Sequence, residues 1–391
     1  MILEALQAAI DTVIAPDIQK DIVALREHLH ANPELSDNET QTQAKLYETL
    51  IGLGITDIKK VQTGMVARIP GKNPSALPVA IRGDIDALPI TEATGLPFSS
   101  KNNGVMHACG HDVHASWAMG VAMLLSKQPA EADVYVVFQH AEELATGARQ
   151  IIESGVLPKQ LRAIVGGHVD RRYGVGEVVV HNGAIASFSD KFFVTLHGKS
   201  SHAARPEEGC NPIPALASCI QFITNMAASI GEESVKNIIT ITQVKGGDRH
   251  NIIPGSVSFT GTIRCLSPEV REQFHAGLKS MPLPDGIQAD VEIKASAPAV
   301  FNTPELEPVV TDVIERVCGK NAAIPLYKLN LASEDFGHFA NAYPAWFFRF
   351  GARYTNGEFI PVHTPDFYAE TETVLVGTMV LSEVVRALAQ Q

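Results

Sequence analysis

The segment His107-Ala-Cys109-Gly-His111 has the highest density of metal-binding side chains in this chain, and Asp112 and His114 follow it. Cys109 and His111 are two residues apart, so both side chains can face one point in an extended or turning segment. A thiolate beside an imidazole suits zinc or a similar borderline transition metal. The Cys-Gly-His triplet is weak evidence by itself, but further clusters of the same chemistry strengthen it.

Three other clusters carry side chains of this kind: His140-Ala-Glu142-Glu143, Gly166-Gly-His168 and His363-Thr-Pro-Asp366. A catalytic zinc site keeps one position open, where the metal lowers the pKa of bound water towards ~7. Hydrolysis also requires a general base near that water, and a carboxylate is the usual choice. Neighbouring side chains in an extended segment point in opposite directions, so one of the two glutamates can ligate while the other takes the proton. The residues alone leave open which glutamate does which.

Bulk composition describes an ordinary globular protein and restricts its partners. The chain has 391 residues, 45% hydrophobic and 19% charged, a length for which two domains are expected. Its net charge of -12 argues against nucleic-acid binding, which requires a basic face.

The N-terminal segment from Met1 to Pro16 contains Glu4 and Asp11 but no Lys or Arg, which is wrong for a signal peptide. No apolar run approaches the ~20 residues of a membrane span. The five scattered cysteines argue against a disulfide framework. A cytoplasmic location is therefore expected.

Strands and helices alternate through much of the chain. Short runs rich in β-branched residues predict strands, and helix-spaced apolar residues predict helices between several of them. The predicted strands are 64–69, 79–85, 134–139, 163–169 and 345–350, and the predicted helices are 2–14, 18–32, 41–53, 115–126 and 147–154. This order predicts an α/β fold with a largely parallel sheet flanked by helices.

The candidate side chains recur at one place relative to these strands. Asp84 and Asp86 end the second predicted strand, the Glu142-Glu143 cluster follows the third, and His168 ends the fourth. His363 lies a loop beyond the fifth strand. Open α/β sheets bind ligands at the carboxyl ends of their strands, so these groups are expected to converge although they are far apart in sequence.

Residues from about 185 to 295 have a different pattern. Strands are predicted at 191–196, 237–244, 256–265 and 287–295, with helices at 211–229 and 268–281. The order βαββαβ is that of a ferredoxin-like sandwich. We therefore expect a discontinuous metal-binding domain, 1–184 and 296–391, interrupted by a smaller inserted domain at 185–295.

Five motifs in this order resemble the aminoacylase/carboxypeptidase family of two-metal peptidases, peptidase family M20, and in particular its amidohydrolase subfamily. That subfamily includes N-acyl-amino-acid hydrolases, hippurate hydrolase and auxin-conjugate hydrolases. The resemblance runs from about Arg26 to Phe367 and is specific as an ordered set. Its motifs are Arg82-Gly-Asp-Ile-Asp-Ala-Leu-Pro89, His107-Ala-Cys-Gly-His-Asp112, Ala141-Glu-Glu143, Gly167-His168, and Ser333-Glu-Asp-Phe336 with His363-Thr-Pro-Asp366.

The resemblance implies a site for two divalent ions, whether zinc, manganese, nickel or cobalt. It implies that Cys109 bridges the two ions and that the terminal ligands are His111, Glu143, His168 and His363. Glu142 matches the general base, and Asp86 matches the acidic residue that orients the site from outside the ligand set. The remaining histidines nearby, at 107, 114 and 140, are expected to support the site or the fold.

The inserted domain resembles the family's lid, which often forms the contact between two subunits. His202 matches a histidine that helps to polarise the scissile carbonyl and can come from the partner subunit. Asn251 and Arg264 match groups that hold the substrate, typically its carboxylate. The segments after His168 and after Pro206 depart from many relatives, which affects the expected substrate rather than the chemistry.

The sequence therefore predicts a metal-dependent amidohydrolase that cleaves N-acyl amino acids or similar small, peptide-like amides and works as a homodimer or higher homo-oligomer. One alternative is a dipeptidase or carboxypeptidase of the same fold, and another is a metal-dependent binding protein without turnover. A third alternative uses Cys109 as a nucleophile, but it leaves the glutamate pair and the remote His363 without a role.

Overall fold

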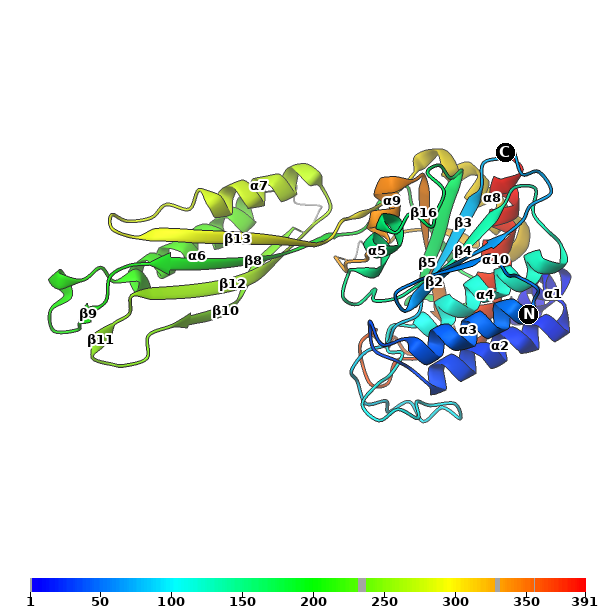
Figure 1. The fold of residues 1–391 in the computed structure, drawn as a ribbon, viewed down its shortest axis with the longest axis horizontal. Coiled ribbons are helices and arrows are strands. Elements are labelled where there is room, and N and C mark those ends of the chain that lie inside the picture. Colours follow the sequence, from blue (N-terminus) through cyan, green and yellow to red (C-terminus); the bar gives the residue numbers. More distant parts are fainter. Residues whose placement is uncertain (1, 231–236, 328–330, 355) are drawn as a thin grey trace. The chain divides into compact units, whose positions relative to one another are not determined.

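The fold is that of a computed structural model, which describes residues 2–230, 237–327, 331–354 and 356–391 (Figure 1). The chain divides into two compact units. Unit 1 comprises Met1–Ile185, Val300–Lys328 and Asp335–Gln391, and unit 2 comprises Ala186–Ala299 and Leu329–Glu334. The short segment Leu329–Glu334 of unit 2 was expected in the metal-binding domain. It joins unit 2 because the Ser187 N–H donates to the Ala332 carbonyl at 2.9 Å beside the first strand of that unit.

Unit 1 is built on an eight-stranded sheet with the order β1-β2-β4-β3-β5-β16-β6-β15. Its central strands β4, β3, β5 and β16 are parallel, whereas β1, β2 and β6 add antiparallel pairings towards the edges. The strands are β1 (Ile58–Val61), β2 (Gly64–Ile69), β3 (Val79–Asp84), β4 (Val134–Gln139), β5 (Ala163–Gly174), β6 (Val178–Val180), β15 (Ala323–Pro325) and β16 (Ala345–Arg353), with a separate pair β7 (Gly183–Ala186) and β14 (Val300–Asn302). The predicted, largely parallel α/β sheet is confirmed.

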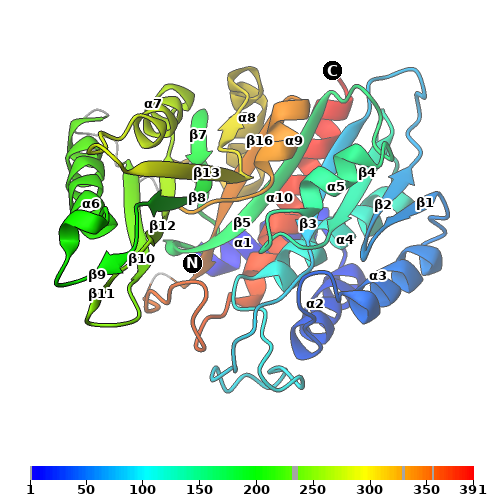
Figure 2. The same ribbon diagram turned by 60° about the vertical axis from the view of Figure 1, so that its left-hand side comes forward.

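Helices cover both faces of this sheet (Figure 2). They are α1 (Ile2–Val13), α2 (Pro16–Ala31), α3 (Thr40–Gly52), α4 (His111–Lys127), α5 (Gly147–Glu153), α8 (Glu307–Cys318), α9 (Gly337–Ala342) and α10 (Thr371–Ala389). Helix α4 packs against β3 so closely that a Cβ on Gly83 would lie 2.3 Å from the His114 carbonyl oxygen. Arg82 points to the opposite face, where it reaches Asp335 just before α9.

The core of unit 1 lies between the sheet and the helices α4 and α10. Residues 111–125 of α4 are all buried, because α4 lies between the sheet and the helices α2 and α10. Trp117 of α4 is buried against Phe350 of β16, with ring centroids 4.7 Å apart. In the described part of the chain, no helix combines the length and the apolar composition that crossing a bilayer requires.

Unit 2 is an antiparallel four-stranded sheet with two helices. Its order β10-β12-β8-β13 places the strands in the 2-3-1-4 order of a ferredoxin-like sandwich. The elements are β8 (Phe188–His197), α6 (Pro212–Ser229), β10 (Ile238–Gly246), β12 (Ser256–Cys265), α7 (Pro268–Lys279) and β13 (Gln288–Ala297), with a short ribbon of β9 (Ser201–His202) and β11 (Ile252–Ile253). A 3-10 turn at Pro206–Glu208 lies in unit 2, and another at Pro304–Leu306 lies in unit 1.

Most predicted elements have the expected type, but two differences affect the site. Helix α4 begins at His111 rather than at residue 115, so this candidate ligand lies in the first helical turn. Strand β5 continues to Gly174, five residues beyond the predicted end, because it also pairs with the longer β16. The long C-terminal helix α10 had no sequence prediction.

Candidate metal centre

The turn from Cys109 into α4 determines how two candidate ligands meet. Gly110, which precedes the helix, has a φ of +88°, a left-handed conformation that glycine adopts without steric cost. A Cβ at this position would also lie 2.4 Å from Cγ2 of Val169. Glycine therefore allows Cys109 and His111 to lie on the two sides of a tight turn at the carboxyl ends of the strands.

Two groups of potential ligand atoms share the sulfur of Cys109. One group is Cys109, His111 and His168, and the other is Cys109, Glu143 and His363; within each group the ligand atoms all lie within 4.8 Å of one another. The Sγ atom is 3.2 Å from Nε2 of His168 and 3.2 Å from Nε2 of His363. The structure therefore brings together all five predicted ligands around one thiol.

Hydrogen bonds on the far side of two rings fix their orientation. Nδ1 of His111 lies 3.0 Å from Oδ1 of Asp86, and Nδ1 of His168 lies 2.7 Å from the Val169 carbonyl oxygen. A carbonyl or carboxylate oxygen can only accept, so Nδ1 carries the proton in both rings. The Nε2 atoms then face the cluster, where a bound metal would take the place of any proton on them.

Glu142 and Glu143 lie in a turn, so the expectation that they point in opposite directions along an extended segment is wrong. Oε2 of Glu142 and Oε1 of Glu143 are each 3.9 Å from Nε2 of His111. Ala141 and Ala145, on either side of the pair, have φ values of +48° and +56°. This left-handed backbone turns both carboxylates towards the same cluster.

His363 is held by its backbone although its side chain is 49% exposed. Its φ is +64°, and its N–H donates to the Ala108 carbonyl at 2.8 Å. Nε2 of His363 lies 3.3 Å from Oε1 of Glu143. Three of the six non-glycine residues with positive φ in the described chain thus lie at or beside this cluster, a concentration typical of functional sites.

Asp86 connects the histidine and glutamate parts of the cluster. It is 1% exposed and accepts hydrogen bonds from Oγ of Ser36 at 2.7 Å and from the Glu143 N–H at 3.0 Å. Burial opposes its ionisation, but the hydrogen bonds from His111, Ser36 and Glu143 lower its pKa below the ordinary value. Asp86 is therefore an anionic acceptor that orients its neighbours.

Burial and neighbouring charges separate the protonation states within the cluster. Burial and Glu143 raise the pKa of the Cys109 thiol well above its usual range, so the thiol by itself is a poor nucleophile. Burial, His114 and Arg349 hold the pKa of His168 well below its usual range, which keeps this ring neutral. Burial lowers the pKa of His111, but Asp84 and Cys109 outweigh it and raise that pKa well above the usual range. A divalent cation would reverse the preference of the thiol, because it stabilises the thiolate.

Of the three other histidines near the cluster, His114 and His140 are held by hydrogen bonds and His107 is not. Nδ1 of His114 lies 2.7 Å from Oδ1 of Asp84, and its Nε2 accepts from the Val169 N–H at 3.0 Å, so both ring nitrogens are in use. Nε2 of His140 lies 2.6 Å from Oε1 of Gln150. His107 is buried, and neither ring nitrogen has a hydrogen-bond partner among the described residues.

Sequence reasoning missed Glu39, a fully buried carboxylate whose Oε1 accepts from the Ala141 N–H at 2.9 Å. It lies at the beginning of a helix, where an acidic residue is ordinarily explained by the helix dipole. Nothing in the local sequence indicates that it contacts a residue about a hundred positions away. Asp335 lies within the Ser333-Glu-Asp-Phe336 motif, but its residue type and position predicted no role for it.

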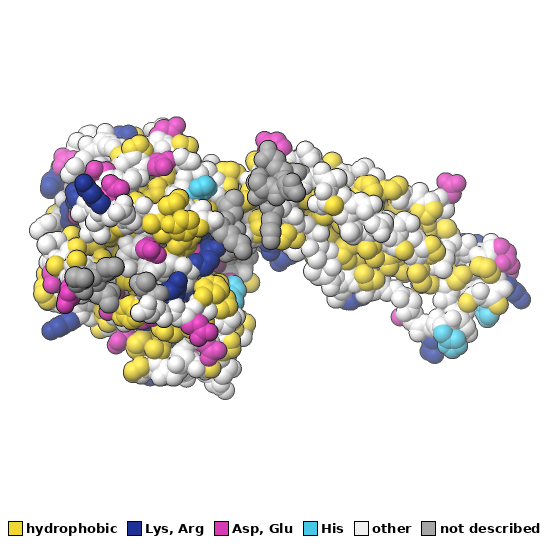
Figure 3. Space-filling model, turned by 180° about the vertical axis from the view of Figure 1, so that it is seen from behind, with side chains coloured by type: hydrophobic (Ala, Val, Ile, Leu, Met, Phe, Trp, Pro, Cys, Tyr) yellow, Lys and Arg dark blue, Asp and Glu magenta, His cyan; other side chains and the backbone are white. Residues whose placement is uncertain are grey.

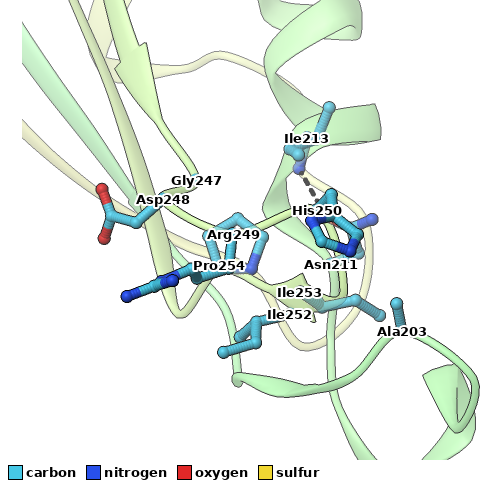
Figure 4. A pocket seen from close by; sticks show the side chains of 10 residues that line it. All are labelled: Ala203, Asn211, Ile213, Gly247, Asp248, Arg249, His250, Ile252, Ile253 and Pro254. Carbon is cyan, nitrogen blue, oxygen red and sulfur yellow. Dashed lines mark hydrogen bonds between the residues drawn. The ribbon is translucent and has the colours of Figure 1, made fainter.

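The predicted substrate-contacting residues lie in unit 2. His202 of β9 pairs with Ile252 of β11, and the Ala203 N–H donates to the Asn251 carbonyl at 3.0 Å. His202 and Asn251 are thus neighbours at the two-stranded ribbon of β9 and β11. A pocket of about 510 Å³ adjoins this ribbon (Figure 4), and its lining residues are Ala203, Asn211, Ile213, Gly247, Asp248, Arg249, His250, Ile252, Ile253 and Pro254.

Arg264 is not brought together with that ribbon within the same chain. Strands β8 and β12 pair from Ser256 with His197 at one end to Cys265 with Phe188 at the other. The ribbon follows the His197 end, whereas Arg264 pairs with Ser189 near the opposite end. Arg264 lies eight positions along the strand from Ser256, which corresponds to about 26 Å at ~3.3 Å per residue.

An α/β sheet that gathers a thiol, imidazoles and carboxylates at the carboxyl ends of its strands defines the class of metal-dependent hydrolases. Residues 80–387 match the model of peptidase family M20/M25/M40. The chain therefore belongs to this family.

Known proteins similar to this chain include two bacterial deacetylases and one solved structure. N-acetyl-L-cysteine deacetylase of Bacillus subtilis is 32% identical over 379 residues, which are 95% of this chain and 89% of that protein. N-acetyldiaminopimelate deacetylase of Listeria monocytogenes is 32% identical over 339 residues, 85% of this chain and 90% of that protein. The crystal structure of a dinuclear metal-binding peptidase of the family from Bacillus subtilis superposes with a TM-score of 0.81 at 29% identity, covering 96% of this chain and 99% of that one.

Proposed function

We propose that this protein is an amidohydrolase that cleaves the amide bond of N-acyl amino acids with two divalent metal ions. The observation that carries the proposal is the pair of ligand groups that share the sulfur of Cys109. The thiolate of Cys109 would help to hold both cations, with His111 and His168 as further ligands of one ion and Glu143 and His363 as further ligands of the other. The names of the deacetylase relatives support the substrate class.

The chemistry of the donor set fits borderline metals such as zinc, manganese, cobalt or nickel, because it combines sulfur, imidazole and carboxylate. Such ions, when bound, polarise the scissile carbonyl and lower the pKa of a coordinated water. Glu142 belongs to neither ligand group around Cys109 but reaches within 3.9 Å of His111. We assign Glu142 as the general base that accepts the proton of the attacking water and returns it to the leaving amine.

His202 is proposed to stabilise the oxyanion, and Asn251 and Arg264 to bind the substrate carboxylate. An N-acyl amino acid is about as long as two extended residues, roughly 7 Å. It cannot contact both ends of β12 in one chain. The length of this strand therefore favours a site in which His202 and Asn251 come from one subunit and Arg264 from its partner.

Unit 2 also offers a surface through which two subunits could pair. Strand β10 forms an edge of the four-stranded sheet, and its Ile238 and Val244 are 38% and 49% exposed. Apolar side chains also gather on the face of unit 2 in Figure 3. An exposed strand edge with apolar side chains is a template for pairing with a second chain. We propose a homodimer through unit 2.

The proposed location is the cytoplasm. Its support is the state of the cysteines, because all five are free in the structure and three of them are buried. Free thiols persist in a reducing compartment.

The test is hydrolysis of a substrate panel by metal-loaded enzyme. N-acetyl, N-benzoyl and longer N-acyl amino acids would be compared with dipeptides, each with zinc, manganese, cobalt and nickel. We expect acylated amino acids to be hydrolysed and dipeptides to react poorly. Preferential hydrolysis of dipeptides would instead identify a dipeptidase, and full activity without bound metal would refute the proposal.

A further inference from the structure

The turn that carries the two glutamates is strained and closed tightly. The Ala141 carbonyl accepts from the N–H groups of Thr146 and Gly147, both at 3.3 Å. A Cβ on Gly147 would lie 1.6 Å from the His140 carbonyl oxygen, so only glycine allows this closure. Alanines in the left-handed conformation at both ends are costly, and such a turn persists only where its surroundings hold it.

Glu39 holds the backbone of this turn from outside. It is fully buried and lies immediately before α3, far from Glu142 in sequence. Its Oε1 accepts from the Ala141 N–H at 2.9 Å, and its Oε2 accepts from Oγ1 of Thr63 at 2.5 Å. A carboxylate with both oxygens satisfied fixes the peptide group between His140 and Ala141, one residue before Glu142.

Asp335 contacts Glu142 directly through its backbone, while its own side chain is anchored elsewhere. The Asp335 N–H donates to Oε1 of Glu142 at 3.4 Å. The Asp335 carboxylate is fully buried and accepts from Arg82 at 3.1 Å, from Gln139 at 2.7 and 2.9 Å, and from the Ala148 N–H at 3.1 Å. This anchoring determines where the Asp335 N–H points.

We propose that Glu39 and Asp335 are positioning residues for the general base. Glu39 fixes the backbone of the turn at Ala141, and Asp335 fixes the carboxylate of Glu142 through a backbone hydrogen bond. Neither residue belongs to a ligand group around Cys109. The inference rests on the proposed function, in which Glu142 transfers the proton.

The hydrogen-bond pattern predicts different tolerance at the two positions. Glu39→Gln keeps an oxygen for the Ala141 N–H and places an amide, which can donate, opposite the Thr63 hydroxyl. Asp335→Asn places an NH₂ group opposite the N–H donors of Gln139 and Ala148, or of Arg82 if the amide is flipped. Two donors facing each other leave buried groups unsatisfied, so this substitution displaces Asp335.

The experiment compares Glu39→Ala, Glu39→Gln and Asp335→Asn in the metal-loaded enzyme, with the best N-acyl amino acid as substrate. We expect Glu39→Ala and Asp335→Asn to lower kcat by about 10- to 10²-fold, the scale for a small misplacement of a reacting group. KM and the number of bound ions, measured by elemental analysis, should not change. Glu39→Gln should restore most of kcat.

Asp133→Asn is a matched control at the other end of β4. Asp133 also accepts from an arginine, Nε of Arg68 at 2.8 Å, and from a backbone N–H, that of Gly71 at 2.8 Å. Its loss should lower Tm while kcat remains that of the wild type. If Asp133→Asn lowers kcat as much as Asp335→Asn does, the effect is general destabilisation and the proposal is overturned.

A double-mutant cycle with Glu142→Gln decides whether the two residues act through the base. Once Glu142 is replaced, Glu39→Ala and Asp335→Asn should lower kcat no further, although each still lowers Tm. An equal loss in both backgrounds, or a loss of bound metal, would overturn the proposal and leave the proposed function standing. Wild-type kcat in Glu142→Gln itself would refute the proposed base. If Asp335→Asn fails to fold, the two Glu39 variants decide the proposal alone.

Discussion

The metal centre of unit 1 and the ribbon of β9 and β11 that carries His202 in unit 2 are constructed in opposite ways. In the metal centre, the buried ring of His111 is oriented by a hydrogen bond to a further buried group, Asp86. His202 is exposed and lies in a strand of two residues, and its Nδ1 accepts from the Ala204 N–H of the same turn. The first arrangement suits tight binding of cations, whereas the second suits a group that contacts substrate only when the site is assembled.

This contrast separates two kinds of defect. Substitutions in unit 1 should change metal content or stability together with turnover. Substitutions in the ribbon of β9 and β11 should change turnover alone. The predictions below test that separation, starting with the largest expected effect.

Replacement of the shared ligand should have the greatest consequence. Cys109→Ala removes the atom common to both ligand groups, so fewer than two ions per chain should remain after dialysis, and most turnover should disappear. Elemental analysis with parallel assays measures both quantities. EDTA treatment of the wild type should produce the same loss, and re-addition of metal should reverse it only in the wild type. A fully active, metal-free Cys109→Ala variant would contradict the shared-ligand assignment.

The two glutamates should separate cleanly despite being adjacent. Glu142→Gln keeps size and hydrogen bonding but removes the base, so turnover should fall by roughly 10²-fold or more with near-normal metal content. Glu143→Gln should lose metal, because Glu143 lies in a ligand group with Cys109 and His363. If the two variants show the reverse behaviour, the roles of the two glutamates are exchanged.

His202→Ala should lower turnover strongly while metal content and Tm stay at wild-type values, because His202 is exposed and belongs to neither ligand group around Cys109. Hybrid dimers of His202→Ala and Glu142→Gln chains should recover part of the activity if two subunits share each site. Recovery would establish the shared site. Absence of recovery in a preparation shown to contain hybrids would mean that each chain builds its site alone.

A smaller, pH-dependent effect on the stability of the fold is expected at His30 of α2. His30 lies 2.9 Å from Asp112 and 3.2 Å from Glu92. Burial lowers the pKa of His30, but Asp112 and Glu92 outweigh it and raise it to about 9. A raised histidine pKa stabilises the fold fully below the unfolded value of about 6.5, and this contribution is lost as the pH rises through about 9.

Thermal unfolding from pH 6 to pH 10 measures this contribution. We expect the difference in Tm between the wild type and His30→Gln to shrink above pH 9. The shift bounds the contribution at about 3 kcal/mol, since each pKa unit corresponds to ~1.4 kcal/mol. A difference in Tm that is constant across this range would contradict the ion-pair explanation.

The sequence was sufficient for the parts that depend on local pattern and motif order. The order of predicted strands and helices anticipated the four-stranded sheet of unit 2 with its two helices, and the rule for strand ends predicted that the Glu142-Glu143 pair, His168 and His363 converge. Prediction from the sequence failed where a contact between residues far apart in the chain determines the backbone conformation. Nothing local indicates that Ala141 adopts a left-handed φ, because Glu39 and the closure at Gly147 impose it.

The separation along β12 was also beyond the sequence. The family resemblance placed Asn251 and Arg264 in one role, and they are only thirteen positions apart in the chain. Most of the intervening segment is the extended strand β12, so this short distance in sequence becomes a long distance in space. The order of the motifs identifies which residues form the site, but it contains no information on which subunit supplies each residue.

The length of β12 has a consequence for mass action. If each site needs groups from both ends of this strand, an isolated chain cannot complete one. Specific activity would then depend on total enzyme concentration and fall on dilution below the dissociation constant of the dimer, although every chain retained its metal ions and its fold. A cell could thereby regulate turnover through the abundance of the protein alone, with a steeper than proportional response at low abundance.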